Sequence, residues 1–170
     1  GRQVLILASG VRLSVGSPMK VIGIDPGIGR TGWAILETSH LRRSGCLETL
    51  PNSPLPDRLK CLFTELSQIL NEEKPDHAAI EDLFFEKNAK TAIAVGAGRG
   101  VIVLTCALAN IPVFNYSPLQ VKSAVTGNGH ADKKSVEFMV KKLLNLEKTP
   151  KPDDIVDAIA IALTHLAIFR

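Results

Sequence analysis

Apolar residues along the chain follow two different periods, and each period predicts a different kind of element. Short apolar runs predict strands at residues 20–25, 31–38, 41–50, 77–81 and 112–116. Apolar residues that recur every three or four positions predict helices at residues 55–73, 91–110, 132–146 and 153–169, with a short helical turn opening at Ser117. The resulting order, β-β-β-α-β-α-β-α-α, predicts an α/β fold with one mixed β-sheet flanked by helices.

Residues 91–110 are apolar over nearly the length of a membrane-spanning helix. Arg99 lies near the middle of this stretch, however, and a central arginine costs about 2.5–3.5 kcal/mol in lipid. The glycines around Arg99 suit close packing against a sheet or a second helix. We therefore expect a buried helix and no membrane partner.

Residues 1–18 differ in character from the rest of the chain. They contain two arginines and no acidic residue, and the first clear strand begins directly after Met19. A signal peptide is an alternative interpretation, but the apolar run at residues 4–8 is short. We expect residues 1–18 to be added or upstream residues that form a disordered tail. Residues 19–170 should form a single domain, because no long linker divides them.

Composition places the chain among globular proteins, with 45% hydrophobic and 22% charged residues over 170 positions. Its three cysteines are an odd number and form no C-x-x-C pair. This pattern argues against a structural zinc site and favours a reducing compartment. We therefore expect a cytoplasmic protein.

Charge is unevenly distributed along the chain. Residues 19–86 carry 11 acidic and 7 basic side chains, whereas residues 87–142 carry 8 basic and 2 acidic ones. An acidic front half beside a basic middle suggests a metal or acid site next to a surface that binds a polyanion. Solvated helix faces explain much of the same asymmetry, so the charges alone do not decide between the two.

Two predicted strands end in a carboxylate. Asp25 follows the apolar residues 21–24, and a strand that is apolar on both faces lies in the centre of a sheet. A charge there is costly unless it is paired or binds a cation, although a local turn cap before Pro26 is the alternative. Glu81, with Asp82 beside it, ends the second apolar strand, where an exposed strand end is the alternative.

The final predicted helix carries a third acidic signal. Asp154 and Asp157 are three positions apart, so they share one face of a helix that is otherwise almost without charge. The helix dipole suffices to explain acids in the first turn, but it explains Asp157 less well. Asp153 also shares a face with Asp157, so the spacing leaves open whether Asp153 assists or replaces Asp154.

The four carboxylates come without a cluster of histidine or cysteine, which describes a site for a hard cation. Oxygen ligands suit Mg²⁺, with Mn²⁺ as the alternative, rather than Zn²⁺. Two such ions in one site activate a water and stabilise the leaving oxygen of a phosphodiester. The residues that we predict to be catalytic and metal-binding are Asp25, Glu81, Asp154 and Asp157.

Basic and aromatic residues suit a nucleic-acid surface. Lys122, Lys133 and Lys134 bracket a Gly-x-Gly loop, where their charges can contact backbone phosphates. Phe84 and Phe85 are adjacent aromatics in a predicted loop, and stacking on an unpaired base is worth about 1–3 kcal/mol. Solvated lysines and packed phenylalanines are the alternatives, and we expect the packed role for Phe85.

Several groups of residues occur in the order and spacing of a known family. They are Ile24-Asp25-Pro26-Gly27 with Thr31-Gly32, then Ala79-Ile80-Glu81 with Phe84 and Lys87-Asn88, then Gly98-Arg99-Gly100, then Gln120-Val121-Lys122 with Gly127, Gly129 and Lys133, and finally Asp154 and Asp157-Ala158 with Ala160 and Thr164-His165. Over residues 19–170 this pattern resembles the RuvC family of Holliday-junction resolvases. The chain departs from the commoner pattern in that Asp153 precedes Asp154 and bulky residues separate the last two acids.

The resemblance implies an RNase H-like nuclease domain and a homodimer that makes paired symmetric nicks across a four-way DNA junction, in recombination and repair, leaving 5′-phosphate ends. It places the four catalytic acids on the four carboxylates above. The DNA-contacting residues that we expect from it are Phe84, Lys122 and Lys133, with Lys134 beside them. The resemblance also suggests association with RuvA and RuvB, and we expect the dimer interface at the helix around Arg99 or the loop near Phe85.

Three other functions remain as alternatives. Another RNase H-fold nuclease, similar to the YqgF relatives, acts on RNA or replication intermediates and shares the opening strand. An actin-like ATPase also has a strand that ends in aspartate, but this chain is too short for its two lobes. A non-catalytic junction-binding protein would keep the basic surface, but the four intact acids argue against it. We expect a Mg²⁺-dependent, structure-selective endonuclease.

Overall fold

A five-stranded mixed sheet lies at the centre of the protein. The structure is a computed structural model, and it describes residues 5–6, 12–13, 18–82 and 89–169. Its strands are β3 (Lys20–Asp25), β4 (Arg30–Glu37), β5 (His40–Glu48), β6 (His77–Glu81) and β7 (Val113–Tyr116). Their order across the sheet is β5-β4-β3-β6-β7. The first three strands are antiparallel neighbours, whereas β6 and β7 run parallel to β3.

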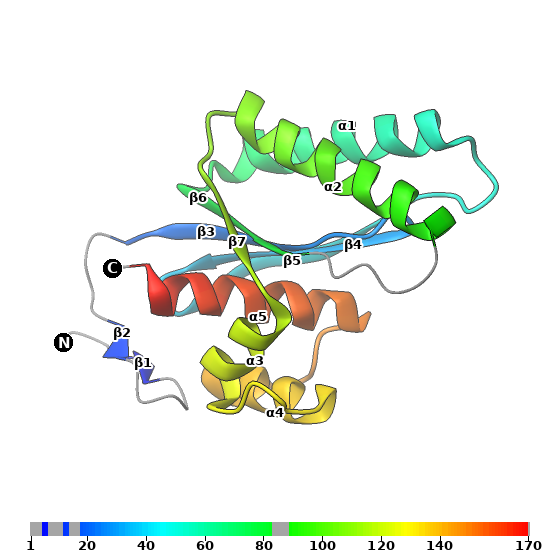
Figure 1. Cartoon of the computed structure of the whole chain (residues 1–170). Coiled ribbons are helices and arrows are strands. Elements are labelled where there is room, and N and C mark those ends of the chain that lie inside the picture. Colours follow the sequence, from blue (N-terminus) through cyan, green and yellow to red (C-terminus); the bar gives the residue numbers. More distant parts are fainter. Residues whose placement is uncertain (1–4, 7–11, 14–17, 83–88, 170) are drawn as a thin grey trace.

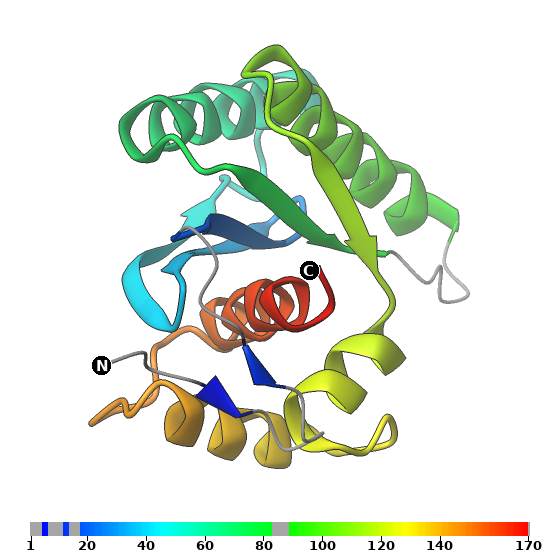
Figure 2. The ribbon, with the colours of Figure 1, turned by 90° about the vertical axis from the view of Figure 1, so that its left-hand side faces the viewer.

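Helices cover both faces of the sheet (Figure 1). They are α1 (Leu55–Glu73), α2 (Ala89–Leu108), α3 (Pro118–Thr126), α4 (Lys133–Leu143) and α5 (Asp153–Ile168). The helices α1 and α2 lie together on one face, and α5 packs on the other. Figure 2 shows α5 between the sheet and the pair α3 and α4. The predicted α/β fold, a mixed sheet flanked by helices, is confirmed.

Two hydrophobic layers result from the alternation of side chains along the strands. Ile22 and Ile24 of β3 pack with the α1 and α2 layer, whereas Val21 packs with the α5 layer. Ala78 and Ile80 of β6 likewise belong to the first layer. Most of α5 is buried because it has the sheet on one side and α3 and α4 on the other.

Helix α2 differs from its prediction. Only 22% of the segment Thr91–Leu108 is buried in the protein. The expectation of a buried helix is therefore wrong for the face of α2 that is exposed. Among the described residues this is also the one helix that is long and apolar enough to cross a membrane, a test that is weak evidence for a membrane span. Its opposite face packs on α1 and inserts Ile102 and Cys106 into the core.

Other boundaries shift by one to three residues. Residues 118–126 form a complete helix, α3, rather than a short turn, because Ser117 and Gln120 form a reciprocal capping box. In the N-terminal segment the described residues form a short antiparallel pair, β1 (Leu5–Ile6) and β2 (Arg12–Leu13). The assignment of residues 1–18 to a tail and of 19–170 to one domain stays a prediction.

Candidate active site

Asp25 reaches the α5 face of the sheet because of strand alternation. Ile22 and Ile24 point to the α1 and α2 layer, so residues 21, 23 and 25 face α5. On the neighbouring strand Asp25 is paired with Gly32, which has no side chain to fill the space beside the carboxylate. The carboxyl end of β3 therefore presents an acidic group to the helix that crosses it.

Glu81 reaches the same face from the adjacent strand. Strands β3 and β6 are parallel, and Ile24 pairs with Ile80, so Asp25 and Glu81 follow at the same edge of the sheet. Ala79 belongs to the α5 layer and Ile80 to the opposite one, so alternation turns Glu81 toward α5. The prediction that two strand ends bring these two carboxylates together is confirmed by this register.

Helix α5 supplies the other two acids through a close approach to the sheet. A Cβ atom at Gly32 would collide with the backbone carbonyl of Asp154, and one at Gly23 would collide with that of Ala158. These two glycines allow the first turns of α5 to lie directly on β3 and β4. The helix thereby carries Asp154 and Asp157 to the strand ends.

Burial and mutual repulsion show that the carboxylates form one electrostatic cluster. Burial, then repulsion from Glu81, Asp157 and Asp154, raises the pKa of Asp25 to about 8. Burial and repulsion from Asp157 raise the pKa of Glu81 to about 7. The pKa of Asp157 is also raised, chiefly by burial. These groups resist carrying their negative charges together at neutral pH unless a cation is present.

Two lysines border the cluster in a shared cavity of about 210 Å³. Its charged lining residues are Glu81, Lys122, Lys133 and Asp157. Lys122 comes from α3, which the Ser117 capping box starts, and Lys133 is the first residue of α4 after the N-cap Asp132. The structure therefore brings two of the predicted DNA-binding lysines to the predicted acidic residues.

Lys133 forms ion pairs with two carboxylates of α5. Its Nζ atom lies 2.7 Å from Oδ2 of Asp153 and 3.2 Å from Oδ2 of Asp157. The hydrogen bond to Asp153 contributes most to a raised pKa of Lys133, and the same bond lowers the pKa of Asp153. A lysine cation therefore sits at the rim of the acidic cluster.

The donor set fits a hard divalent cation. All four carboxylates offer oxygen ligands, and the raised pKa values of Asp25 and Glu81 reflect charge that a cation would compensate. In the described part of the chain, no three Asp, Glu, His or Cys side chains converge closely enough to coordinate one ion.

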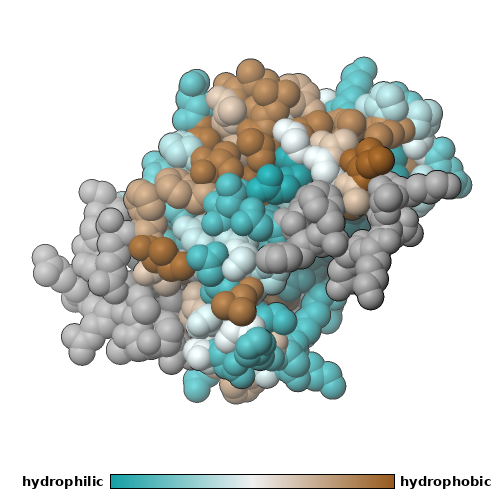
Figure 3. All heavy atoms as spheres, viewed as in Figure 1, coloured by the Kyte–Doolittle hydropathy of each residue, from teal (hydrophilic) through white to brown (hydrophobic). Residues whose placement is uncertain are grey.

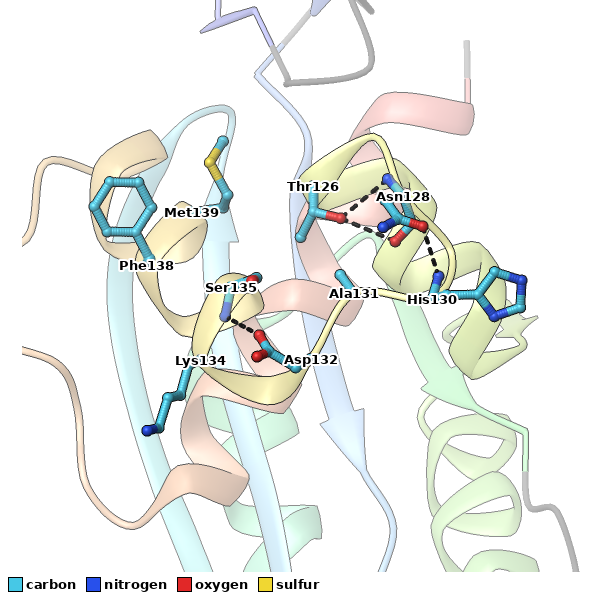
Figure 4. A pocket seen from close by; sticks show the side chains of 9 residues that line it. All are labelled: Thr126, Asn128, His130, Ala131, Asp132, Lys134, Ser135, Phe138 and Met139. Carbon is cyan, nitrogen blue, oxygen red and sulfur yellow. Dashed lines mark hydrogen bonds between the residues drawn. The ribbon is translucent and has the colours of Figure 1, made fainter.

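One predicted DNA-binding residue, Lys134, lies outside this cavity. Lys134 lines a larger, open cavity of about 760 Å³ at the start of α4 (Figure 4). Polar groups there form hydrogen bonds with one another. The Thr126 hydroxyl donates to the carbonyl oxygen of Asn128 and accepts from the Asn128 N–H, and the Ser135 N–H donates to Asp132 at 2.8 Å. Phe84 lies outside the described residues, as does Phe85.

Sequence reasoning missed a link between α2 and the acidic edge of the sheet. One Nη atom of Arg99 lies 3.1 Å from Oδ1 of Asp82 and donates a hydrogen bond to Oδ1 of Asn115 at 2.7 Å. Arg99 thus joins α2 to the ends of β6 and β7, directly beside Glu81. A charge in an otherwise apolar helix was the available signal, but its partners are 16 and 17 residues away.

Comparisons with known proteins agree with this geometry. A family model described as "Crossover junction endodeoxyribonuclease RuvC" matches residues 21–165. A protein of that name from Pelotomaculum thermopropionicum is 46% identical over 151 residues, covering 86% of this chain and 92% of that protein. Another, from Caldicellulosiruptor saccharolyticus, is 48% identical over 153 residues, covering 87% and 92%.

A solved structure shows the same architecture. It is described as T. thermophilus RuvC in complex with Holliday junction substrate, and it matches with a TM-score of 0.84 and 34% identity. The match covers 88% of this chain and 93% of that one. The RNase H-like fold that the sequence resemblance implied is thereby confirmed.

Proposed function

Because this chain belongs to the RuvC family of crossover junction endodeoxyribonucleases, we propose that it resolves four-way DNA junctions at the acidic cluster. The reaction is hydrolysis of phosphodiesters, which makes paired, symmetric nicks in two strands of the junction and leaves 5′-phosphate ends. The observation that carries the proposal is the convergence of Asp25 and Glu81 at one sheet edge, under the helix that bears Asp154 and Asp157.

The proposed cofactor is Mg²⁺, with Mn²⁺ as an alternative, and two ions in each active site. The residues that would hold the ions are Asp25, Glu81, Asp154 and Asp157. Bound divalent ions supply an activated water and neutralise charge at the leaving oxygen. The protein itself contributes a rigid edge, because the four carboxylates come from two central strands and one buried helix.

The proposed DNA-binding surface runs from this cavity along α3 and α4. Lys122 and Lys133 border the acids, so they can contact phosphates that flank the cleaved bond. Lys134, the second residue of α4, extends the basic surface toward the neighbouring open cavity. Phe84, three residues after Glu81 in the chain, is proposed to stack on a base at the junction.

The exposed apolar face of α2 is the proposed homodimer interface. Ile93, Leu104 and Leu108 are exposed to 73%, 53% and 63% and lie on one side of the helix. Figure 3 shows hydrophobic surface gathered over this part of the molecule. A patch of this kind marks an interaction surface, and a two-fold dimer matches a substrate with two symmetric scissile strands.

Family membership is the support for two further proposals. We infer association with the branch-migration proteins RuvA and RuvB, and a cytoplasmic location, with which the three unpaired cysteines agree. An RNA-directed nuclease similar to the YqgF relatives is not favoured, because the family model and the relatives above carry the junction-nuclease description.

Asp25→Asn tests the proposed catalytic role. The amide keeps the size of the side chain but weakens cation binding, so nicking of a synthetic four-way junction should fall by more than about 100-fold. Junction binding, measured by gel shift in EDTA, should be at least as tight as in the wild type. Asp57→Asn, the same change in the first turn of α1, is the matched control and should nick normally. Wild-type nicking by Asp25→Asn would refute the proposal.

A further inference from the structure

Asp153 is an acid that the proposed function does not use. It lies at the first position of α5, four residues before Asp157, and its side chain is 53% exposed. Its closest charged partner is the ammonium of Lys133, at 2.7 Å. The structure thus gives Asp153 a basic partner rather than a place among the buried carboxylates.

The charges that act on Asp25 distinguish Asp153 from Asp154. The charges that most strongly raise the pKa of Asp25 are Glu81, Asp157 and Asp154, and Asp153 is not among them. Neither acid is among the main charges that act on Glu81, and both raise the pKa of Asp157. The carbonyl of Asp154, in contrast, lies against Gly32, the residue paired with Asp25. Asp154, and not Asp153, is therefore the acid of the first turn of α5 that belongs to the cluster.

The ammonium of Lys133 lies 3.2 Å from the Asp157 carboxylate, where a divalent cation would also bind. With Asp157 as its only partner, the ammonium would compete with a divalent ion for that oxygen. Lys133 is also the first residue of α4, where the helix dipole disfavours a positive charge. A second carboxylate nearby compensates for both effects.

We propose that Asp153 is a positioning residue that holds the Lys133 ammonium at the rim of the cavity and leaves Asp157 available to a divalent cation. This inference rests on the proposed function and deepens it. When Asp157 binds a cation, Lys133 keeps its shorter ion pair with Asp153 and stays beside the acids, directed toward the surface where a DNA phosphate would lie.

A Mn²⁺ titration tests the proposal without relying on cleavage. Free Mn²⁺ is followed by its electron paramagnetic resonance signal in wild type, Asp153→Asn, Lys133→Gln and the double variant. Asp153→Asn should weaken Mn²⁺ binding about two- to fivefold, the range expected for an exposed ion pair. In the Lys133→Gln background the same change should have almost no effect, because no ammonium is left to compete. Asp153→Glu should restore wild-type affinity.

The controls separate this inference from the proposed function. Asp57→Asn also removes an acid from the first turn of a helix, so it reports any effect of lost helix-dipole stabilisation. Asp25→Asn should abolish tight Mn²⁺ binding, and if it does not, the proposed metal site itself fails. If that control behaves as expected, unchanged affinity in Asp153→Asn overturns the positioning role. Equal weakening in both Lys133 backgrounds overturns it too, because Asp153 would then act on the ion directly.

Discussion

Asp25 is a residue that is costly for the fold and that we propose to be necessary for the site. Its pKa of about 8 means that the folded protein holds a proton that the unfolded chain releases near pH 4. The free energy of unfolding therefore falls as the pH rises from about 4 to about 8, because only the unfolded chain ionises Asp25 freely in this range, and a bound divalent cation would offset this loss. Sequence reasoning found this residue because a carboxylate after an apolar strand is visible without coordinates.

His165 is a second buried titratable group, and its effect on the free energy of unfolding changes with pH in the opposite direction. It is fully buried in α5, and its ring nitrogens lie 2.7 Å from the Tyr116 hydroxyl and 2.9 Å from His77 Nδ1. Burial, and then the charge of His77, lowers the pKa of His165 to about 4. The folded protein therefore keeps this ring neutral over a pH range in which the unfolded chain binds a proton.

The His165 contribution to stability should be complete above pH 6.5 and should disappear as the pH falls toward 4. The loss is up to about 3 kcal/mol, because the unfolded chain binds the proton that the folded protein excludes. Urea unfolding at several pH values checks this as the difference between wild type and His165→Gln, which cancels the opposite slope of the acidic cluster. The exposed His40→Gln is the matched control. A difference that does not change with pH would contradict the assignment.

The limits of residue-level prediction follow from distance along the chain. The sequence does not reveal the partners of His165, because Tyr116 and His77 lie 49 and 88 residues away. The ion pair of Asp153 with Lys133 also joins two separate helices. Spacing within one helix could not decide between Asp153 and Asp154, because that choice depends on which side of α5 meets the sheet.

At the scale of elements, the contact between α5 and the sheet sets the geometry of the site. Gly23 and Gly32 face the helix backbone, and neither position has room for a Cβ atom. The strands and long helices were predictable, because apolar periodicity reports them directly. The close approach of α5 was not, since glycines in a strand are compatible with several arrangements until the neighbouring element is known.

Gly32→Ala should move the first turn of α5 away from the sheet and with it Asp154. We expect a loss of about 1–3 kcal/mol in unfolding free energy, the usual effect of overpacking, and a larger proportional loss of junction nicking. Thermal unfolding and a nicking assay on the same preparations check this. Gly98→Ala in α2 is the matched control, because the nearest atom to its new methyl group lies 3.5 Å away, an ordinary contact, and alanine favours a helix. Unaltered nicking in Gly32→Ala would contradict the proposed dependence on α5.

At the scale of the whole molecule, the two faces of the sheet carry different tasks. The α5 face carries the acids and lysines, whereas the α1 and α2 face ends in exposed apolar side chains on α2. The sequence predicted a buried helix there because apolar residues usually indicate burial within the chain. Periodicity within one chain does not distinguish an apolar face that is buried in the core from one that a second molecule would cover.

Leu104→Glu should convert the proposed dimer into a monomer that is still folded. Leu104 is 53% exposed, so the charge costs little within one chain but is strongly unfavourable in an apolar interface. Sedimentation velocity measures the oligomeric state, and circular dichroism checks the fold. Leu50→Glu, at an exposed leucine outside α2, is the control and should stay dimeric. A Leu104→Glu protein that remains dimeric would place the interface elsewhere.

We propose that one cation-binding acidic cluster cleaves branched DNA. The most direct test is a strand-nicking time course on a four-way junction and on a linear duplex of the same sequence, with Mg²⁺ or with EDTA. We expect symmetric nicks in the junction with Mg²⁺, and no nicks in the duplex or in EDTA. Nicking in EDTA, or equal nicking of the linear duplex, would contradict it.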